Sequence, residues 1–223
     1  MNPVNYSAAR STESVLATNK LIKNTYMLLS LTLLFSALTA GMSMVFNLPH
    51  PGMIITLVGY FGLLWATNKF ANSGWGLLFV FLLTGFMGLT LGPIISAYIQ
   101  AFSNGGELVM MAMGGTGVIF LGLSGYALTS RKDFSFMGGF LMVGILVAFL
   151  AGIGAAIFSI PALSLAVSAM FVLLMSGLIL YQTSQIVHGY ETNYILATVT
   201  LYVSIYNLFL SLLQLLGAFS GED

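Results

Sequence analysis

The chain has very little charge: of its 223 residues, six are Lys or Arg and six are Asp or Glu. Charged residues make up 5% and hydrophobic residues 58%, and the mean hydropathy is +1.00. A soluble domain carries roughly 25% charged residues, so this composition excludes an ordinary soluble fold. The charges cancel to a net of zero and leave no basic surface for a nucleic acid, so we expect no nucleic-acid partner.

Cysteine is absent, which excludes disulfides, thiolate metal sites and thiol nucleophiles. Histidine is scarce as well: His50 lies between two prolines, and His188 lies with Glu191 in a short polar segment that we interpret as a solvated loop. No paired acids or clustered metal ligands occur in the apolar runs. We therefore predict no catalytic residue, no metal site and no cofactor, and we expect that the chain is not an enzyme. The lack of intramembrane acids also argues against a proton-coupled transporter.

Long apolar runs are what the chain has instead. Uncharged stretches of 45, 37, 23, 57 and 30 residues separate the charges from Lys23 to Glu222. About 20 apolar residues cross a bilayer as a helix, so these stretches hold two, one, one, two and one crossings. The runs are continuous and do not alternate as in a membrane barrel. The prediction is an all-α, polytopic bundle of seven transmembrane helices at 25–47, 52–68, 75–98, 107–129, 135–158, 162–186 and 194–217.

Short breakers separate these helices. The stretch from Asn47 to Gly52 contains two prolines, and Ser159-Ile160-Pro161 links the fifth and sixth helices so tightly that they must form an antiparallel hairpin. Residues 25–219 are therefore predicted to form one membrane domain without an extramembrane insertion. Residues 1–24 are polar. We interpret them as a flexible cytoplasmic tail and not as a cleaved signal peptide, because the apolar run begins only near Tyr26 and is long.

Orientation follows from the basic residues. If the tail is cytoplasmic, seven crossings place all six of them on the same side, and they are Arg10, Lys20, Lys23, Lys69, Arg131 and Lys132. Glu107, Glu222 and Asp223 then lie on the other side. We expect a bacterial inner-membrane protein with a cytoplasmic N-terminus and a periplasmic C-terminus.

Small residues at four-residue spacing predict close helix packing. The fifth helix carries Gly144, Ala148, Gly152 and Ala156, and the third carries Gly88 and Gly92.

The last helix carries a polar stripe. Small or polar residues recur at alternating spacings of four and three, on one helix face, while the other faces are apolar. The members are Asn193, Ala197, Thr200, Ser204, Asn207, Ser211 and Gln214. An amide buried in hydrocarbon without a partner costs several kcal/mol, so this face is expected to point away from lipid. The last helix should therefore be central.

Two interpretations of the stripe remain open. The favoured one is interhelical hydrogen bonding, worth roughly 1 kcal/mol per bond, with Gln182 near the end of the sixth helix as the expected partner. The other is a hydrated path for ions or solutes.

Four segments resemble a known family: residues 91–94, 129–139, 180–198 (LYQTSQIVHGYETNYILAT) and 201–209. They are similar to the signature of the Bax-inhibitor (transmembrane BAX inhibitor motif) family, and the resemblance runs from about residue 19 to the end. It is strongest to bacterial members that modulate the membrane-bound ATP-dependent protease FtsH. The resemblance implies seven helices with the last one surrounded by the other six.

The same resemblance implies two functions. The first is binding FtsH and modulating its proteolysis of membrane proteins, with the tail as the handle that FtsH engages. The alternative is a calcium leak channel, which in many members is controlled by a pair of acids in the sixth and seventh helices. The matching positions are Gln182 and Ser204, which can hydrogen-bond to each other but cannot titrate. A leak through this chain would therefore be constitutive and insensitive to pH. A purely structural subunit is a third class.

Overall fold

The computed structural model describes residues 3–220, with side chains from Leu16 onward. These residues form helices and connecting turns, with no strand among them. The long helices are α1 (Pro3–Val45), α2 (Met53–Phe70), α3 (Gly74–Ala101), α4 (Gly105–Ser130), α5 (Gly138–Ile157), α6 (Pro161–Val187) and α7 (Tyr194–Ser220), and a 3-10 turn, η1 (Ser135–Met137), precedes α5. Seven helices are long and apolar enough to cross a membrane, which confirms the predicted fold class.

Local chemistry sets the helix ends. After α1, Asn47 takes a left-handed conformation with φ 49°, and Gly52 with φ 89° directly precedes α2. Pro161 occupies the first turn of α6, where its missing N–H costs no helical hydrogen bond. These are the breakers that the sequence marks, so the predicted boundaries of α2 to α7 agree with the structure to within three residues.

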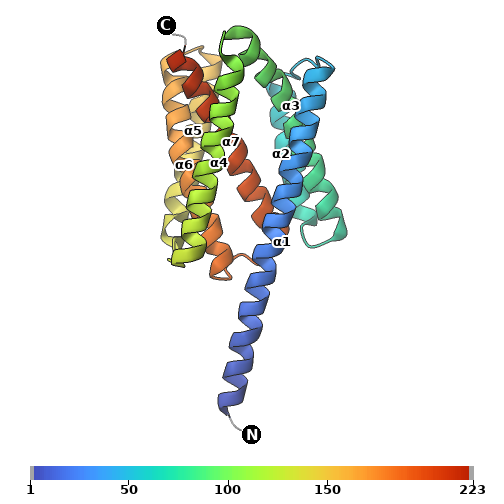
Figure 1. The fold of residues 1–223 in the computed structure, drawn as a ribbon, viewed down its shortest axis with the longest axis vertical. Helices are drawn as coiled ribbons and strands as arrows, with labels where there is room; N and C mark the ends of the chain where they lie inside the picture. The colour runs from blue at the N-terminus through green and yellow to red at the C-terminus, as the bar shows by residue number, and fades with distance from the viewer. Residues whose placement is uncertain (1–2, 221–223) are drawn as a thin grey trace.

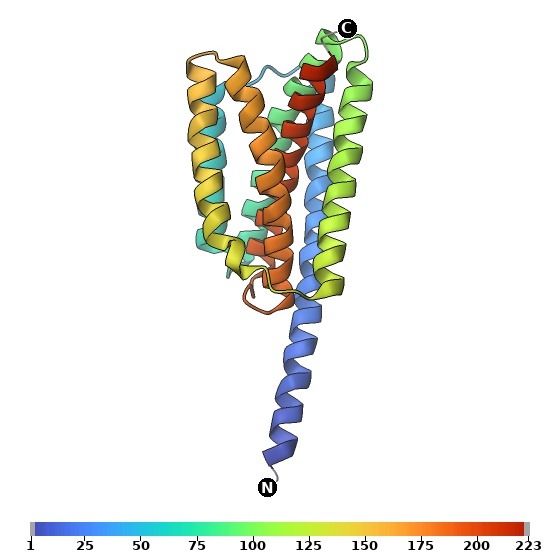
Figure 2. The same cartoon turned by 90° about the vertical axis from the view of Figure 1, so that its left-hand side faces the viewer.

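The N-terminal boundary differs from the expectation. The structure carries α1 back to Pro3, through most of the segment 1–24 that we expected to be a flexible tail. The first part of α1 projects beyond the other helices, away from the bundle (Figures 1 and 2). Hydropathy marks only the apolar part of this helix, and the candidate membrane span falls within Leu16–Val45.

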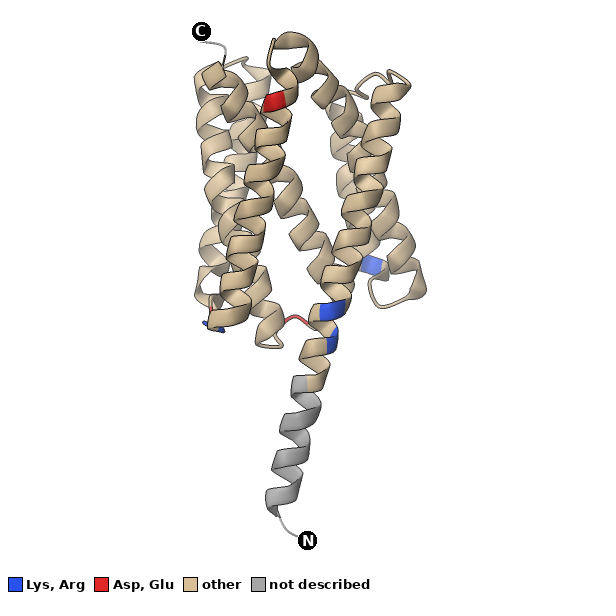
Figure 3. Cartoon of the chain, in the orientation of Figure 1, with Lys and Arg blue, Asp and Glu red and all other residues tan. Residues whose placement is uncertain are grey.

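The helices run up and down, so the start of α1 lies at the same end as the α2–α3, α4–α5 and α6–α7 connections. Lys20, Lys23, Lys69, Arg131 and Lys132 belong to this end (the basic end hereafter), where Figure 3 shows the Lys and Arg residues gathered. The Arg10 side chain lies outside the described ones. Glu107, in the first turn of α4, lies at the opposite end. The Lys and Arg side chains that the structure describes thus lie at one end of the bundle, as the sequence predicts.

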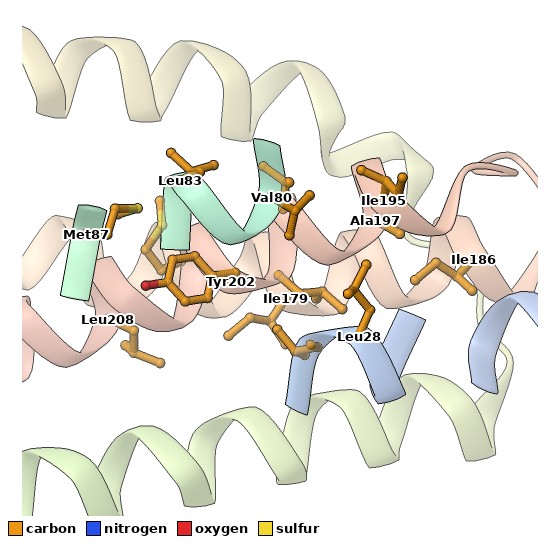
Figure 4. Packing of buried hydrophobic residues seen from close by; sticks show 14 of the residues in the cluster. Leu28, Val80, Leu83, Met87, Ile179, Ile186, Ile195, Ala197, Tyr202 and Leu208 are labelled. Atoms are coloured by element: carbon orange, nitrogen blue, oxygen red, sulfur yellow. The ribbon is translucent and has the colours of Figure 1, made fainter. Parts of the chain in front are cut away.

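Helix α7 occupies the centre of the bundle. It packs against α1, α3, α4 and α6, and 56% of its most apolar segment is buried, compared with 6% for α2. Figure 4 shows Leu28 of α1, Leu83 of α3 and Ile179 of α6 gathered around Tyr202 of α7. The outer helices are α2, which packs on α3, and α5, which packs on α6. The last helix is therefore central, as predicted, with four helices as its main neighbours.

Small residues lie at the helix contacts. Gly92 of α3 faces Ser43 and Ala40 of α1, because a Cβ atom at this position would lie 2.6 Å from Ser43 Cβ and 2.7 Å from the Ala40 carbonyl oxygen. Gly144 of α5 faces the Leu174 side chain of α6 in the same way. The small-residue spacing in α3 and α5 therefore marks the α1–α3 and α5–α6 interfaces.

Candidate functional site on the central helix

The polar stripe begins at the basic end with Asn193, which fixes the start of α7. The Asn193 side-chain oxygen accepts from the backbone N–H groups of Ile195 (2.9 Å) and Leu196 (3.2 Å), an N-cap. Its amide nitrogen donates to the Ala71 carbonyl (3.1 Å) and to Asn72 Oδ1 (2.8 Å). One side chain thus caps the central helix and ties it to the α2–α3 turn.

The middle of the stripe bonds to its own helix. The Thr200 and Ser204 hydroxyls donate to the Leu196 carbonyl (3.1 Å) and the Thr200 carbonyl (2.7 Å). Asn207 Nδ2 donates to the Val203 carbonyl (2.9 Å). Ser204 and Ser211 are buried, while Thr200 and Asn207 are half-buried. These bonds run within α7, so Thr200, Ser204 and Asn207 donate to their own helix and do not hold another one.

The far end of the stripe does bridge two helices. Gln214 Nε2 donates to Ser164 Oγ (2.6 Å), and Gln214 Oε1 accepts from Ser168 Oγ (2.7 Å), with both serines on α6. Within the described residues, the stripe thus bonds to other parts of the bundle at its two ends: Asn193 bonds to the α2–α3 turn, and Gln214 bonds to α6.

Gln214→Leu should destabilise the bundle by about 1–2 kcal/mol, because it removes both bonds to α6. The matched change Asn207→Leu should shift the unfolding free energy by less than about 0.5 kcal/mol, because Asn207 bonds only its own helix. Reversible unfolding of the purified protein in mixed micelles measures both. Equal losses for the two variants would contradict this assignment.

The expected partnership of Gln182 is wrong. The Ser204 hydroxyl bonds to Thr200, and the buried Gln182 amide nitrogen has no hydrogen-bond partner within the described part of the chain. A Gln182–Ser204 hydrogen bond is therefore not formed. The two glutamines lie at different depths in the bundle. Gln182 lies near the basic end of α6, whereas Gln214 lies near the opposite end, where its amide bonds to the serines of α6.

Tyrosine hydroxyls make interhelical contacts that the sequence analysis missed. The Tyr202 hydroxyl lies 2.6 Å from Ser36 Oγ of α1 and donates to the Thr84 carbonyl of α3 (3.3 Å). Tyr26, Ser124 and Thr183 join α1, α4 and α6 through hydroxyl–hydroxyl distances of 2.9, 3.3 and 3.0 Å. A buried tyrosine usually needs a partner for its hydroxyl, and that rule is the signal that was available in the sequence.

The loops at the basic end form a small polar cluster outside the membrane-spanning segments. Hydrogen bonds from Ser135, a weaker one from Tyr190 and the charge of His188 hold the pKa of Asp133 below its usual value. The hydrogen bond with Asp133 in turn raises the pKa of the Tyr190 hydroxyl. Glu191 Oε1 accepts from the backbone N–H groups of Thr192 (2.8 Å) and Asn193 (2.7 Å). The charged groups of this loop therefore order the turn before α7.

His, Cys, Asp and Glu do not gather into a group of three or more that could hold a metal anywhere in the described residues. The chemistry available on α7 is hydrogen bonding by uncharged hydroxyls and amides.

Comparison with known proteins shows which family and which relatives the chain is similar to. A family model described as "Inhibitor of apoptosis-promoting Bax1" (Bax1-I) matches residues 18–221. A protein of Escherichia coli K12 named "Modulator of FtsH protease YccA" is 51% identical over 217 residues, which are 97% of this chain and 98% of the relative. The same protein in another E. coli strain is named "Inner membrane protein YccA". A membrane protein of Vibrio cholerae is 42% identical over 224 residues, covering all of both chains.

These relatives and the seven candidate spans support a multi-pass inner membrane protein. The chain belongs to the Bax1-I family.

Proposed function

We propose that this chain binds the protease FtsH and modulates its proteolysis of membrane proteins. The observation that carries the proposal is the 51% identity, over 97% of the chain, to a protein named as a modulator of FtsH. Identity of this extent covers every helix, including α1 and the basic-end loops. The proposal is therefore not based on a single shared segment.

The architecture limits where such a partner can bind. The loops between the helices are short, and the one between α5 and α6 spans only residues 158–160. Within residues 3–220, the only long segment outside the bundle is the start of α1, which projects from the basic end (Figure 1). A partner of this chain therefore meets the start of α1, the short loops at either end of the bundle, or the lipid-facing sides of the outer helices.

Two measurements test the proposal. A tagged chain purified from native membranes should carry FtsH with it, and raising its level should slow the FtsH-dependent turnover of a membrane substrate. An unrelated seven-helix membrane protein, expressed at the same level, is the control. Unchanged substrate turnover, together with the absence of FtsH from the purified material, would refute the proposed function.

A leak channel is the second candidate, and one observation favours it. Three buried polar atoms have no hydrogen-bond partner within the described part of the chain: Thr25 Oγ1, Gln182 Nε2 and Gln185 Nε2. They belong to the segments of α1 and α6 at the basic end. Orphaned buried polar atoms commonly indicate internal water, and a hydrated interior is what an ion path requires.

Any calcium flux through the chain should not change steeply between pH 6 and pH 8, because neither Gln182 nor Ser204 ionises. The double change Gln182→Asp and Ser204→Asp should introduce a pH dependence if the family mechanism applies. Flux into liposomes containing the purified protein measures both. A steep response in the unmodified chain that survives His188→Gln would contradict this prediction.

A reporter fused after Asp223 should lie in the periplasm, and one fused before Asn2 should lie in the cytoplasm. The reason is the gathering of the basic residues at the end where α1 enters the bundle, because Lys and Arg are retained on the cytoplasmic side. Paired phosphatase and fluorescent-protein fusions measure the two sides. A cytoplasmic C-terminus would refute the orientation.

A further inference from the structure

A pocket of 260 Å³ lies between α2, α6 and α7. Its α2 wall consists of Tyr60, Leu64 and Asn68, which follow one another at four-residue spacing on one face. Asn68 lies two residues before the end of α2, and Tyr60 lies near the middle of that helix. The pocket therefore extends from the basic end toward the middle of the membrane.

The pocket exists because α2 is attached along only part of its surface. It packs against α3 and meets α5 through Phe61 and Phe149, whose rings lie edge to face with centroids 5.7 Å apart, while α6 and α7 face it across the pocket. Thr67 is the buried residue of α2. Thr200 and Val203 are only half-buried although α7 is central, so this side of the helix is accessible from the pocket.

The chemistry of the lining favours an apolar occupant over water. Five lining residues are aliphatic: Leu64, Leu178, Leu196, Val199 and Val203. Two of the polar donors are already used, since the Thr200 hydroxyl donates to the Leu196 carbonyl (3.1 Å) and Asn68 Nδ2 to the Leu64 carbonyl (2.8 Å). A buried water needs two to four polar partners. The polar groups that remain on the walls are the Tyr60 hydroxyl and the Asn68 side-chain oxygen, which are too few to hydrogen-bond water throughout this volume.

Size then selects among apolar occupants. An α-helix about 10 Å across, with a pitch of about 5.4 Å, takes roughly 400 Å³ per turn, so a partner helix does not fit. A methylene group occupies nearly the ~30 Å³ of a water molecule in the liquid, so the pocket holds a segment of roughly eight methylenes. Apolar walls that face a void lose dispersion contacts, and in a bilayer the nearest material that restores them is lipid hydrocarbon.

We propose that this pocket binds one acyl chain of a phospholipid from the leaflet at the basic end. Its headgroup then lies beyond Asn68, near Lys69. The acyl chain of the lipid fills the space between the outer helix α2 and the polar stripe, and it contacts Val199 and Val203 of α7. This proposal does not depend on the proposed function.

The test uses the full-length protein reconstituted with a phospholipid that carries a photoreactive diazirine in its acyl chain. After irradiation, mass spectrometry should find the label on Leu196 or Thr200, the half-buried lining residues of α7, as well as on outward-facing residues such as Leu173, which is 75% exposed. Val203→Phe should fill the pocket and abolish labelling of α7 while leaving Leu173 labelled. The control is Val143→Phe, the same change on a lipid-facing side chain that is 63% exposed, and it should leave the labelling of α7 unchanged.

Unlabelled α7 in the unmodified protein, with Leu173 labelled, would overturn the proposal whether or not the Val203 variant folds. A second measurement tests for water. Because the chain contains no cysteine, Val203→Cys introduces a single thiol, on a half-buried residue of the pocket wall. Protection of that thiol from a membrane-impermeant, water-soluble maleimide is expected, and rapid reaction would show a hydrated pocket and overturn the proposal.

Discussion

Replacing Gly88 by leucine should separate α1 from α3 and prevent the bundle from folding. Even a Cβ atom at this position would overlap the Thr39 hydroxyl oxygen and the Ser36 carbonyl oxygen of α1. A carbonyl in a helix cannot move aside as a flexible side chain can, so the helices themselves must part. Overpacking a well-packed core typically costs about 1–3 kcal/mol, and a leucine against backbone should exceed that range. The yield of monodisperse protein in detergent, followed by thermal unfolding, measures the loss.

The control is Gly117→Leu on α4. A Cβ atom at Gly117 would meet nothing within 4 Å, so the same substitution should leave yield and thermal stability nearly unchanged. Gly88→Ala should give an intermediate loss, because it adds only the overlapping Cβ atom. If Gly88→Leu and Gly117→Leu behaved alike, the α1–α3 contact would not be the tight interface that the structure describes.

The loss should extend beyond one interface. Ser36 also contacts the hydroxyl of Tyr202, which lies at the centre of the bundle, and Tyr202 donates to Thr84 of α3. Moving α1 away from α3 thus breaks a three-helix hydrogen-bonded contact whose members are all buried. Buried polar groups left without partners each cost about 1–3 kcal/mol, so the packing and hydrogen-bonding losses add.

The fold was predictable from the sequence because the bilayer imposes a simple rule. Backbone groups in hydrocarbon must be satisfied within a helix, so each apolar run of sufficient length is one crossing. Turn formers such as Gly52 and Pro161 then give the boundaries. The start of α1 was not predictable in this way. The segment after Pro3 contains no helix breaker, and extending an existing helix costs little, but hydropathy carries no information about helix outside the membrane.

The candidate site was predictable only in outline. Seven-residue recurrence of Asn193, Thr200, Asn207 and Gln214 shows that one face of α7 is polar. It does not show the partner of each group, because serine and threonine can bond to their own helix as well as across to another. The serines of α6 that bind Gln214 are unremarkable in the sequence. The lateral pocket depends on how α2 is tilted against α3 and α5, which no pattern along the chain specifies.

Deleting the segment Asn2–Ala9, while keeping Lys20 and Lys23 to preserve orientation, should lengthen the lifetime of the protein several-fold in cells that contain FtsH. It should also strengthen the block on other substrates. This expectation rests on the proposed function. An ATP-dependent protease must pull on a segment that it can unfold, and α1 outside the bundle projects away from the other helices (Figure 2). Short helical segments without tertiary packing are marginal in water, so this end can serve as the handle even though it is helical.

Two controls separate this mechanism from a general change in stability. Substituting Asn2–Ala9 with a Gly/Ser sequence of equal length should restore the normal lifetime if length is what the protease needs. Deleting Gly221–Asp223, at the other end of the chain, should leave the lifetime unchanged. Pulse-chase labelling with and without FtsH measures each variant. If the truncated and full-length proteins had equal lifetimes in FtsH-containing cells, the start of α1 would have no part in the mechanism. Contact with FtsH would then have to involve the loops at either end of the bundle or the outer helices.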